Sequence, residues 1–187
     1  HCILCALKTL RGPGKDTIPV DMKQFLIPLY GLLPRIGIPT NETILSSTNA
    51  KDVHSNDEGN IIEEIILCLD HAFLQRRELP SARLAGFLKR LACSSLHCVP
   101  TSSVPLLACT RQIASRYSSS SSSKIGRMLE NEEDIVAEGV FSPDSEDPEH
   151  SNSHATSLWE LSLLRYHIHP KVAEQSSNMA EGKLLKL

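Results

Sequence analysis

The segment that most constrains the fold is 147–172, which holds the only tryptophan of the chain, Trp159. An acidic, proline-containing lead is followed by small residues and then by the dense apolar run 158–164. His169-Pro170 stops that run, and a proline suits the first turn of a following helix. The pattern predicts a helix that packs into a larger helical body rather than an active site. The residues expected to carry this packing are Leu158, Trp159, Glu160, Leu161, Leu164, His169 and Pro170.

Helical patterns recur along the rest of the chain. Apolar residues follow three- and four-residue spacing from Ile61 to Phe73, as on one face of a helix. Aromatic residues make up only 4% of the chain, and leucine and alanine dominate the apolar set, which favours helices over sheets. We therefore predict an all-α fold. The expected helices cover 2–10, 21–33, Asn60 to about 75, Pro80-Ser81 to Val99, Thr101 or Ser102 to Tyr117, a long one capped by Ser151 or Ser153, and a short one from Pro170.

The length of the helix pairs suggests how they are arranged. The two helices between Asn60 and Ser102 span about one HEAT or armadillo repeat, which is ~40–47 residues. The prediction is an α-solenoid of such pairs with two disordered insertions, one polar and aperiodic, the other serine-rich and then acidic. Because the chain begins with His1 in apolar sequence, we expect a piece of a longer protein. The expected parts are 1–39 (end of a preceding helical repeat), 40–59 (mobile loop), 60–117 (helical repeat core), 118–150 (linker) and 151–187 (C-terminal helices with the tryptophan motif).

Charge is distributed unevenly along the chain. The middle is basic, with Glu78 as the only acidic residue between Leu74 and Leu129, and the stretch 130–149 that follows is acidic. A basic helical ridge can hold the phosphates of RNA or DNA, or an acidic protein partner. Two alternatives remain: a solvated helix face, or neutralisation of the ridge by the chain's own acidic stretch. The candidate contact residues are Arg76, Arg77, Arg83, Lys89, Arg90, Arg111 and Arg116.

The sequence supports a metal site or a catalytic site less well than it supports a basic contact surface. Cys2-x-x-Cys5 has metal-ligand spacing, but its only possible partners, Cys93 and Cys98, are loosely spaced, and buried free cysteines are common in helical cores. His167-x-His169 could be a metal pair or half of an acid–base site, yet a histidine before proline at a helix break is more often a packing residue. We expect no cofactor, no metal and no small-molecule substrate.

Cysteine content and hydropathy bear on the compartment. Six cysteines in 187 residues are too few for a disulfide scaffold. No apolar run approaches the ~20 residues that a membrane-spanning helix needs. Both observations favour a reducing intracellular compartment without a membrane partner.

The tryptophan segment resembles a known family. Asp147-Pro148, then Leu-Trp-Glu-Leu-x-Leu-Leu at 158–164, then His169-Pro170-x-Val are similar to the CCAAT-binding-factor domain of nucleolar ribosome-assembly proteins. Segments 10–21, 85–100 and 129–132 resemble the nucleolar complex protein three branch of that family.

The resemblance implies a non-enzymatic α-solenoid scaffold in the nucleus and nucleolus. It implies partnership with a second nucleolar complex protein and with rRNA in the pre-ribosomal particle, in support of large-subunit assembly and rRNA processing. It also implies a link to DNA replication initiation through chromatin binding. The alternatives are a CCAAT-type DNA-binding transcription regulator, although the sequence holds no zinc finger or basic zipper, and a metal-dependent enzyme that uses His167 and His169.

Overall fold

The computed structural model describes residues 1–9, 22–36, 54–75, 79–118, 124–129 and 139–181. Within these ranges every regular element is helical, which confirms the predicted all-α class. The elements are α1 (Cys2–Thr9), α2 (Lys23–Leu32), the 3₁₀ turn η1 (Leu33–Arg35), α4 (His54–Leu69), the π-helical turn η2 (Asp70–Leu74), α5 (Ser81–His97), α6 (Pro100–Tyr117), α7 (Lys124–Met128), the 3₁₀ turn η4 (Ser153–Ala155), α8 (Glu160–Leu164) and α9 (Pro170–Ala180).

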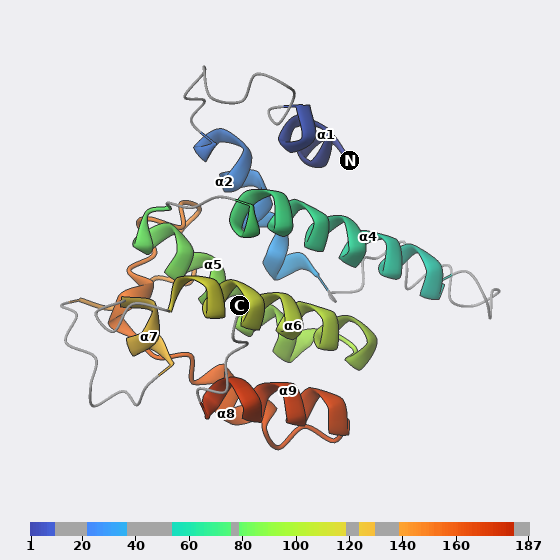
Figure 1. The fold of residues 1–187 in the computed structure, drawn as a ribbon, viewed down its shortest axis with the longest axis vertical. Helices are drawn as coiled ribbons and strands as arrows, with labels where there is room; N and C mark the ends of the chain where they lie inside the picture. The colour runs from blue at the N-terminus through green and yellow to red at the C-terminus, as the bar shows by residue number, and fades with distance from the viewer. Residues whose placement is uncertain (10–21, 37–53, 76–78, 119–123, 130–138, 182–187) are drawn as a thin grey trace.

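Helix α5 is the centre of the molecule. It contacts α6, α7, α8 and the turns η1 and η4, while α1 and α2 lie at one end of the fold and α8 and α9 at the other (Figure 1). The ring of Phe87 on α5 packs between Tyr30 of α2 and Phe73 of η2, with ring centroids 5.1 and 4.8 Å away. The apolar row predicted for this helix is buried throughout: Leu84, Phe87, Leu88, Leu91 and Ala92.

Prolines lie at the starts of helices α5 and α6. Pro80 precedes the first residue of α5, as predicted, and α5 ends before Val99-Pro100. Pro100 itself occupies the first turn of α6, one residue earlier than the expected start. A proline fits there because the first helical residues have no intrahelical acceptor for their N–H groups. None of the described helices is long and apolar enough to cross a membrane.

Two expected helix starts were wrong. Helix α4 begins at His54 rather than Asn60, so the end of the predicted loop 40–59 is helical, and the remainder of that loop lies outside the described residues. No long helix follows Ser151 or Ser153. The hydroxyl of Ser151 donates to the carbonyl of Pro148 at 2.8 Å and lies 2.7 Å from that of Ser153, and such local bonds compete with helix formation. Helix α8 is consequently only five residues long.

Residues 139–150, predicted as part of a linker, form a defined loop. Gly139 and Asn152 both have positive φ, 102° and 50°, and the Ser142 amide donates to the Ser151 carbonyl at 2.9 Å, which closes the loop. A side chain at Gly139 would be strained in that conformation. Of the rest of the predicted linker 118–150, residues 119–123 and 130–138 lie outside the described residues, and the solenoid arrangement stays a prediction.

Candidate functional site: the segment docked on helix α5

The three Lys and Arg residues of α5, which are Arg83, Lys89 and Arg90, all contact the segment 139–164, which we call the docked segment. Arg83, Gly86 and Arg90 lie on one face of the helix, because residues three and seven apart are neighbours on its surface. Lys89 and Cys93, four apart, form the adjacent face. The docked segment packs across both faces, so it is held mainly by residues from one helix.

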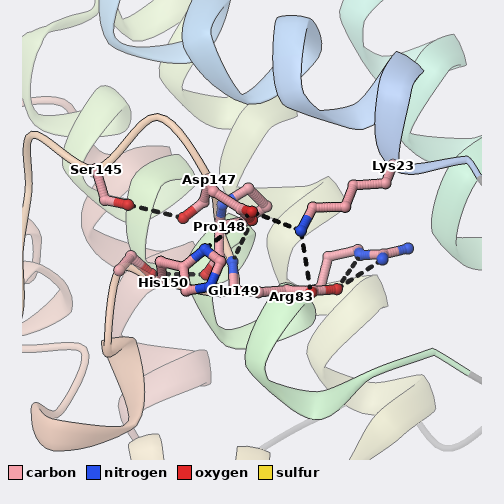
Figure 2. A network of polar contacts seen from close by, with 8 residues as sticks. Lys23, Arg83, Ser145, Asp147, Pro148, Glu149 and His150 are labelled. Atoms are coloured by element: carbon pink, nitrogen blue, oxygen red, sulfur yellow. Dashed lines mark hydrogen bonds and ion pairs between the residues drawn. The ribbon is translucent and has the colours of Figure 1, made fainter.

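The acidic end of the loop is held by two cations from different helices, as Figure 2 shows. Lys23 of α2 lies 2.6 Å from a carboxylate oxygen of Asp147 and 3.5 Å from one of Glu149. Arg83 of α5 approaches Glu149 with two of its nitrogens, at 2.6 and 2.8 Å. A guanidinium that donates twice to one carboxylate fixes its orientation as well as its position.

Asp147 also receives hydrogen bonds from within its own loop. The Glu149 amide donates to it at 2.9 Å, and His150 Nδ1 lies 3.0 Å from its other oxygen. Burial by itself would raise the pKa of Asp147, but the bonds from Lys23, the Glu149 amide and His150 outweigh it and hold the pKa below 3.8. The bond to Asp147 in turn raises the pKa of Lys23 above 10.5.

Gly86 allows the loop to approach the helix backbone. A Cβ atom at this position would lie 2.6 Å from the carbonyl oxygen and 2.9 Å from the Cβ of Pro148. Such separations are too short for real atoms. Only glycine therefore permits Pro148 to rest directly on α5 between Arg83 and Arg90.

The guanidinium of Arg90 joins three parts of the fold. It donates to the carbonyls of Pro143 and Ser145 in the docked segment, at 2.8 and 3.0 Å, and to that of Tyr30 in α2, at 3.0 Å. It also lies 3.5 Å from the centroid of the Tyr30 ring, which is cation–π distance. Desolvation lowers the pKa of Arg90, which nevertheless keeps its charge because an arginine starts from 12.5.

The best-buried contact is an ion pair between Lys89 and Glu160, both with no exposed surface. The Lys89 ammonium lies 2.9 and 3.0 Å from the two carboxylate oxygens and donates to the Ser157 carbonyl at 2.6 Å. Cys93 donates its S–H to the same carboxylate at 2.9 Å. Burial, followed by this bond to Glu160, raises the pKa of the Cys93 thiol to about 12, so it is no nucleophile at neutral pH.

Two aromatic rings of the docked segment cover the Lys89 ammonium. The centroids of Trp159 and Phe141 lie 5.0 and 5.5 Å from its nitrogen. Trp159 was expected to help pack the motif against its neighbours, and its ring does contact Lys89, but 45% of its surface is exposed, so it is not a core residue. The buried residues of this turn are instead Leu158, Glu160 and Leu161. The indole lies over the Lys89 ammonium and is partly exposed to solvent.

Three leucines of the motif are buried, whereas His169 is half-buried and Pro170 is exposed. Leu158, Leu161 and Leu164 are buried, and the Ser176 hydroxyl of α9 donates to the Leu161 carbonyl at 2.6 Å. Pro170 occupies the first turn of α9, with His169 as the residue before it, as predicted.

Three of the seven residues of the predicted basic ridge contact the docked segment. Lys89 cannot meet an external phosphate, because it is fully buried against Glu160. Arg83 pairs with Glu149, so the alternative of neutralisation by the chain's own acidic stretch describes Arg83, whereas Arg90 donates to backbone carbonyls of the docked segment. Arg111 and Arg116 lie half-buried on α6, and Arg76 and Arg77 fall outside the described residues.

The geometry gives no support to a metal site at Cys2 and Cys5 or to a metal or acid–base pair at His167 and His169. The His169 amide donates to Nδ1 of His167 at 2.9 Å, which occupies that lone pair. Cys2 and Cys5 are exposed on α1, whereas Cys93 is bound to Glu160. Across the described part of the chain, no three His, Cys, Asp or Glu side chains gather in a way that could hold a metal ion.

Sequence reasoning placed Glu160 in the packing motif but missed its pairing with Lys89. One signal was present: Lys89 stands within the apolar row 84–92 of a helix with few acidic neighbours. A lysine at such a position must either point towards solvent or pair with a buried carboxylate. The motif's Glu160, flanked by inward-facing leucines, is the carboxylate that the chain supplies.

Comparison with known proteins identifies relatives of this chain. The chain is 30% identical over 183 residues to the human nucleolar complex protein 3 homolog and 31% identical over 183 residues to nucleolar complex protein 3 of Drosophila melanogaster. It is 28% identical over 186 residues to nucleolar complex-associated protein 3 of Schizosaccharomyces pombe. These matches cover 96–97% of this chain and 19–24% of the relatives, so the chain spans about a fifth of their length. The model of the CBF/Mak21 family matches residues 3–176, a range that includes α5 and the whole docked segment. The chain therefore belongs to the CBF/Mak21 family.

Proposed function

We propose that this chain is a non-enzymatic scaffold segment of a nucleolar protein that supports large ribosomal subunit assembly and rRNA processing. Family membership and the names of the relatives, which are nucleolar complex proteins, support a place in the nucleolus and nucleus. The proposed partners are a second nucleolar complex protein and the pre-ribosomal particle with its rRNA. Chromatin binding and replication initiation stay expectations from the resemblance alone.

One structural observation supports this proposal. Glu160, the charged residue of the tryptophan motif, is fully buried on Lys89 rather than directed at a substrate. The motif thereby joins α8 to α5, and Arg83 and Arg90 join the preceding loop to the same helix. Side chains used in this way preserve a shape, which is what a scaffold needs. The contacts with rRNA proposed for Arg76, Arg77, Arg111 and Arg116 stay predictions.

Purification of the complete protein from nuclear extract tests the proposal. We expect precursor rRNA of the large subunit to co-purify, together with a nucleolar complex protein, and to be enriched over precursor rRNA of the small subunit. The small-subunit precursor is the internal control, because its recovery measures how much ribosomal precursor RNA is bound without selectivity. Equal recovery of the two precursors, or recovery of neither, contradicts the proposal.

The DNA-binding alternative is tested by competition. A sequence-specific module would retain a CCAAT-containing duplex against an excess of the same duplex with scrambled bases. We expect the two duplexes to compete equally, because the α5 cations that could contact DNA are occupied by the docked segment.

A further inference from the structure

Large exposed apolar side chains concentrate in one short stretch of the molecule. The described residues hold nine of them, and four lie within 159–168. Their exposed fractions are 45% for Trp159, 56% for Leu163, 89% for Tyr166 and 96% for Ile168. Scattered exposed leucines are ordinary on protein surfaces, but a local cluster with two aromatic rings is typical of an interaction site.

Three of these side chains share one face of a helical turn. Trp159, Leu163 and Tyr166 follow spacing of four and three residues, which places them above one another. The helical backbone continues past α8, since the Arg165 amide donates to the Leu161 carbonyl and that of Tyr166 to the Leu163 carbonyl, at 3.0 and 3.1 Å. The apolar face is therefore already formed before any partner binds.

The opposite face of the same turn is fixed to the body of the protein. Glu160 is paired with Lys89, Leu161 and Leu164 are buried, and the Ser176 hydroxyl bonds to the Leu161 carbonyl. A turn held from behind loses little conformational entropy when its outer face is covered, which favours binding.

Two positive charges flank this face, and the first exposed acidic residue after it is Glu174, three residues beyond Lys171 on α9. Arg165 and Lys171 are exposed, and neither forms an ion pair with any residue of the described ranges. From Leu161 to Ala173 the sequence has no aspartate or glutamate. A partner that covers the apolar side chains would be bound most favourably if its rim were acidic, because opposite charges steer and orient the encounter.

A protein fits this surface better than a nucleic acid strand does. Aromatic rings with adjacent cations could stack unpaired bases. Leu163 and Ile168, however, have no ring on which a base can stack, and exposed aliphatic side chains lose contact with water most fully when apolar side chains of a protein cover them. The mixture of aromatic, aliphatic and arginine side chains is that of a protein–protein interface.

We propose that Trp159, Leu163, Tyr166 and Ile168, flanked by Arg165 and Lys171, form a docking surface for an amphipathic, acid-flanked helix of another polypeptide. This proposal rests on the scaffold function proposed above. It adds the chemistry of one partner and the surface that this partner covers.

The partner is identified by photo-crosslinking in the complete protein expressed in its own cells. Benzoylphenylalanine replaces Tyr166 in one variant and Gln112, an exposed residue of α6, in a control variant. We expect the Tyr166 probe to react with a segment of another polypeptide that has apolar residues at helical spacing between acidic ones, and the Gln112 probe not to reach that segment. A crosslink to RNA, to a second copy of the chain or to another part of the same chain overturns the proposal, as does the absence of any crosslink.

Binding of a synthetic peptide with the crosslinked sequence then tests the surface itself. Leu163→Ser combined with Tyr166→Ser should weaken binding by about 30-fold or more, as at an interface hot spot. Arg165→Glu combined with Lys171→Glu should also weaken it, and a peptide with lysines in place of its acids should recover binding to this variant. Unchanged affinity in both variants overturns the proposal. Thermal unfolding should hardly change, because the substituted side chains are exposed.

The two proposals fail separately. If large-subunit precursor rRNA co-purifies with the protein but the Tyr166 probe finds no acidic helix, the docking surface is wrong and the scaffold function stands. If the helix is found without precursor rRNA, the docking surface stands and the ribosomal role is wrong.

Discussion

Lys89 and Glu160, 71 residues apart in the chain, meet in a fully buried ion pair with 2.9 Å between their charged atoms. The pair joins the central helix to the tryptophan motif. Its remaining hydrogen-bond positions are filled by the Ser157 carbonyl and the Cys93 thiol, and the Trp159 ring covers it. A buried pair completed in this way resists the removal of either partner, because the other charge is then left without compensation.

Glu160→Gln should lower the free energy of unfolding by about 3–5 kcal/mol, because Lys89 would stay buried without an opposite charge. Chemical denaturation followed by circular dichroism measures the change. The double variant Lys89→Met with Glu160→Leu is the control, since replacing both charges by apolar groups should return the stability to within about 1 kcal/mol of the unmodified chain. A double variant as unstable as the single one would show that the ion pair is not what Glu160 contributes.

Gly86→Ala should destabilise the fold by about 1–3 kcal/mol, as expected for an added methyl group that clashes with backbone. The new Cβ would lie 2.6 Å from the Pro148 carbonyl oxygen, so the docked segment has to move. Gly31→Ala in α2 is the matched control. Nothing lies within 4 Å of a Cβ there, and a helical glycine-to-alanine change should stabilise by about 0.5–1 kcal/mol. Equal effects of the two substitutions would disprove the close contact at Gly86.

Trp159→Ala should cost about 1–2 kcal/mol, less than the ~3–5 kcal/mol expected for a core tryptophan. Part of the indole is exposed, and what is lost is its cover over the Lys89 ammonium. The melting temperature of Trp159→Ala should be compared with that of Leu161→Ala, which truncates a buried leucine of the motif. We expect the leucine variant to melt at the lower temperature, and the reverse order would place the indole in the core after all.

The contact between Lys23 and Asp147 should depend on pH at both extremes. The lowered pKa of Asp147 means that its stabilisation is complete above about 3.8 and disappears as the pH falls through the lowered value. The raised pKa of Lys23 means that its stabilisation is complete below about 10.5 and disappears as the pH rises through the raised value. Urea unfolding of the unmodified chain and of Asp147→Asn should therefore differ by a constant amount near neutral pH and converge in acid. A difference that does not shrink as the pH falls below 3.8 would contradict the assignment.

The regular part of the fold could be predicted because its signals are local. Proline at Pro80 and Pro100 marks helix starts by removing an N–H, and the buried row of α5 repeats with the period of a helix. Neither signal depends on what packs against the helix. The same local reasoning placed the start of α9 at Pro170.

The docked segment could not be predicted from local signals. Its acidic residues are typical of a solvated linker, and their ordered positions depend on Lys23 and Arg83, which lie far away in the sequence. The orientation of Trp159 was missed for the same reason. A tryptophan in an apolar run is usually buried, but here the inward position belongs to Glu160, because Lys89 requires a carboxylate in the core.

Hydrogen exchange within the docked segment tests most directly whether it is fixed on α5 by the buried pair. The amides of Ser142 and Leu158, which donate to carbonyls at 2.9 and 2.8 Å, report on its two halves. In the unmodified chain we expect both amides to be protected, and in Lys89→Met both should exchange faster while amides in the middle of α6 change less. Rapid exchange in the unmodified chain, or equal protection in Lys89→Met, would contradict this arrangement.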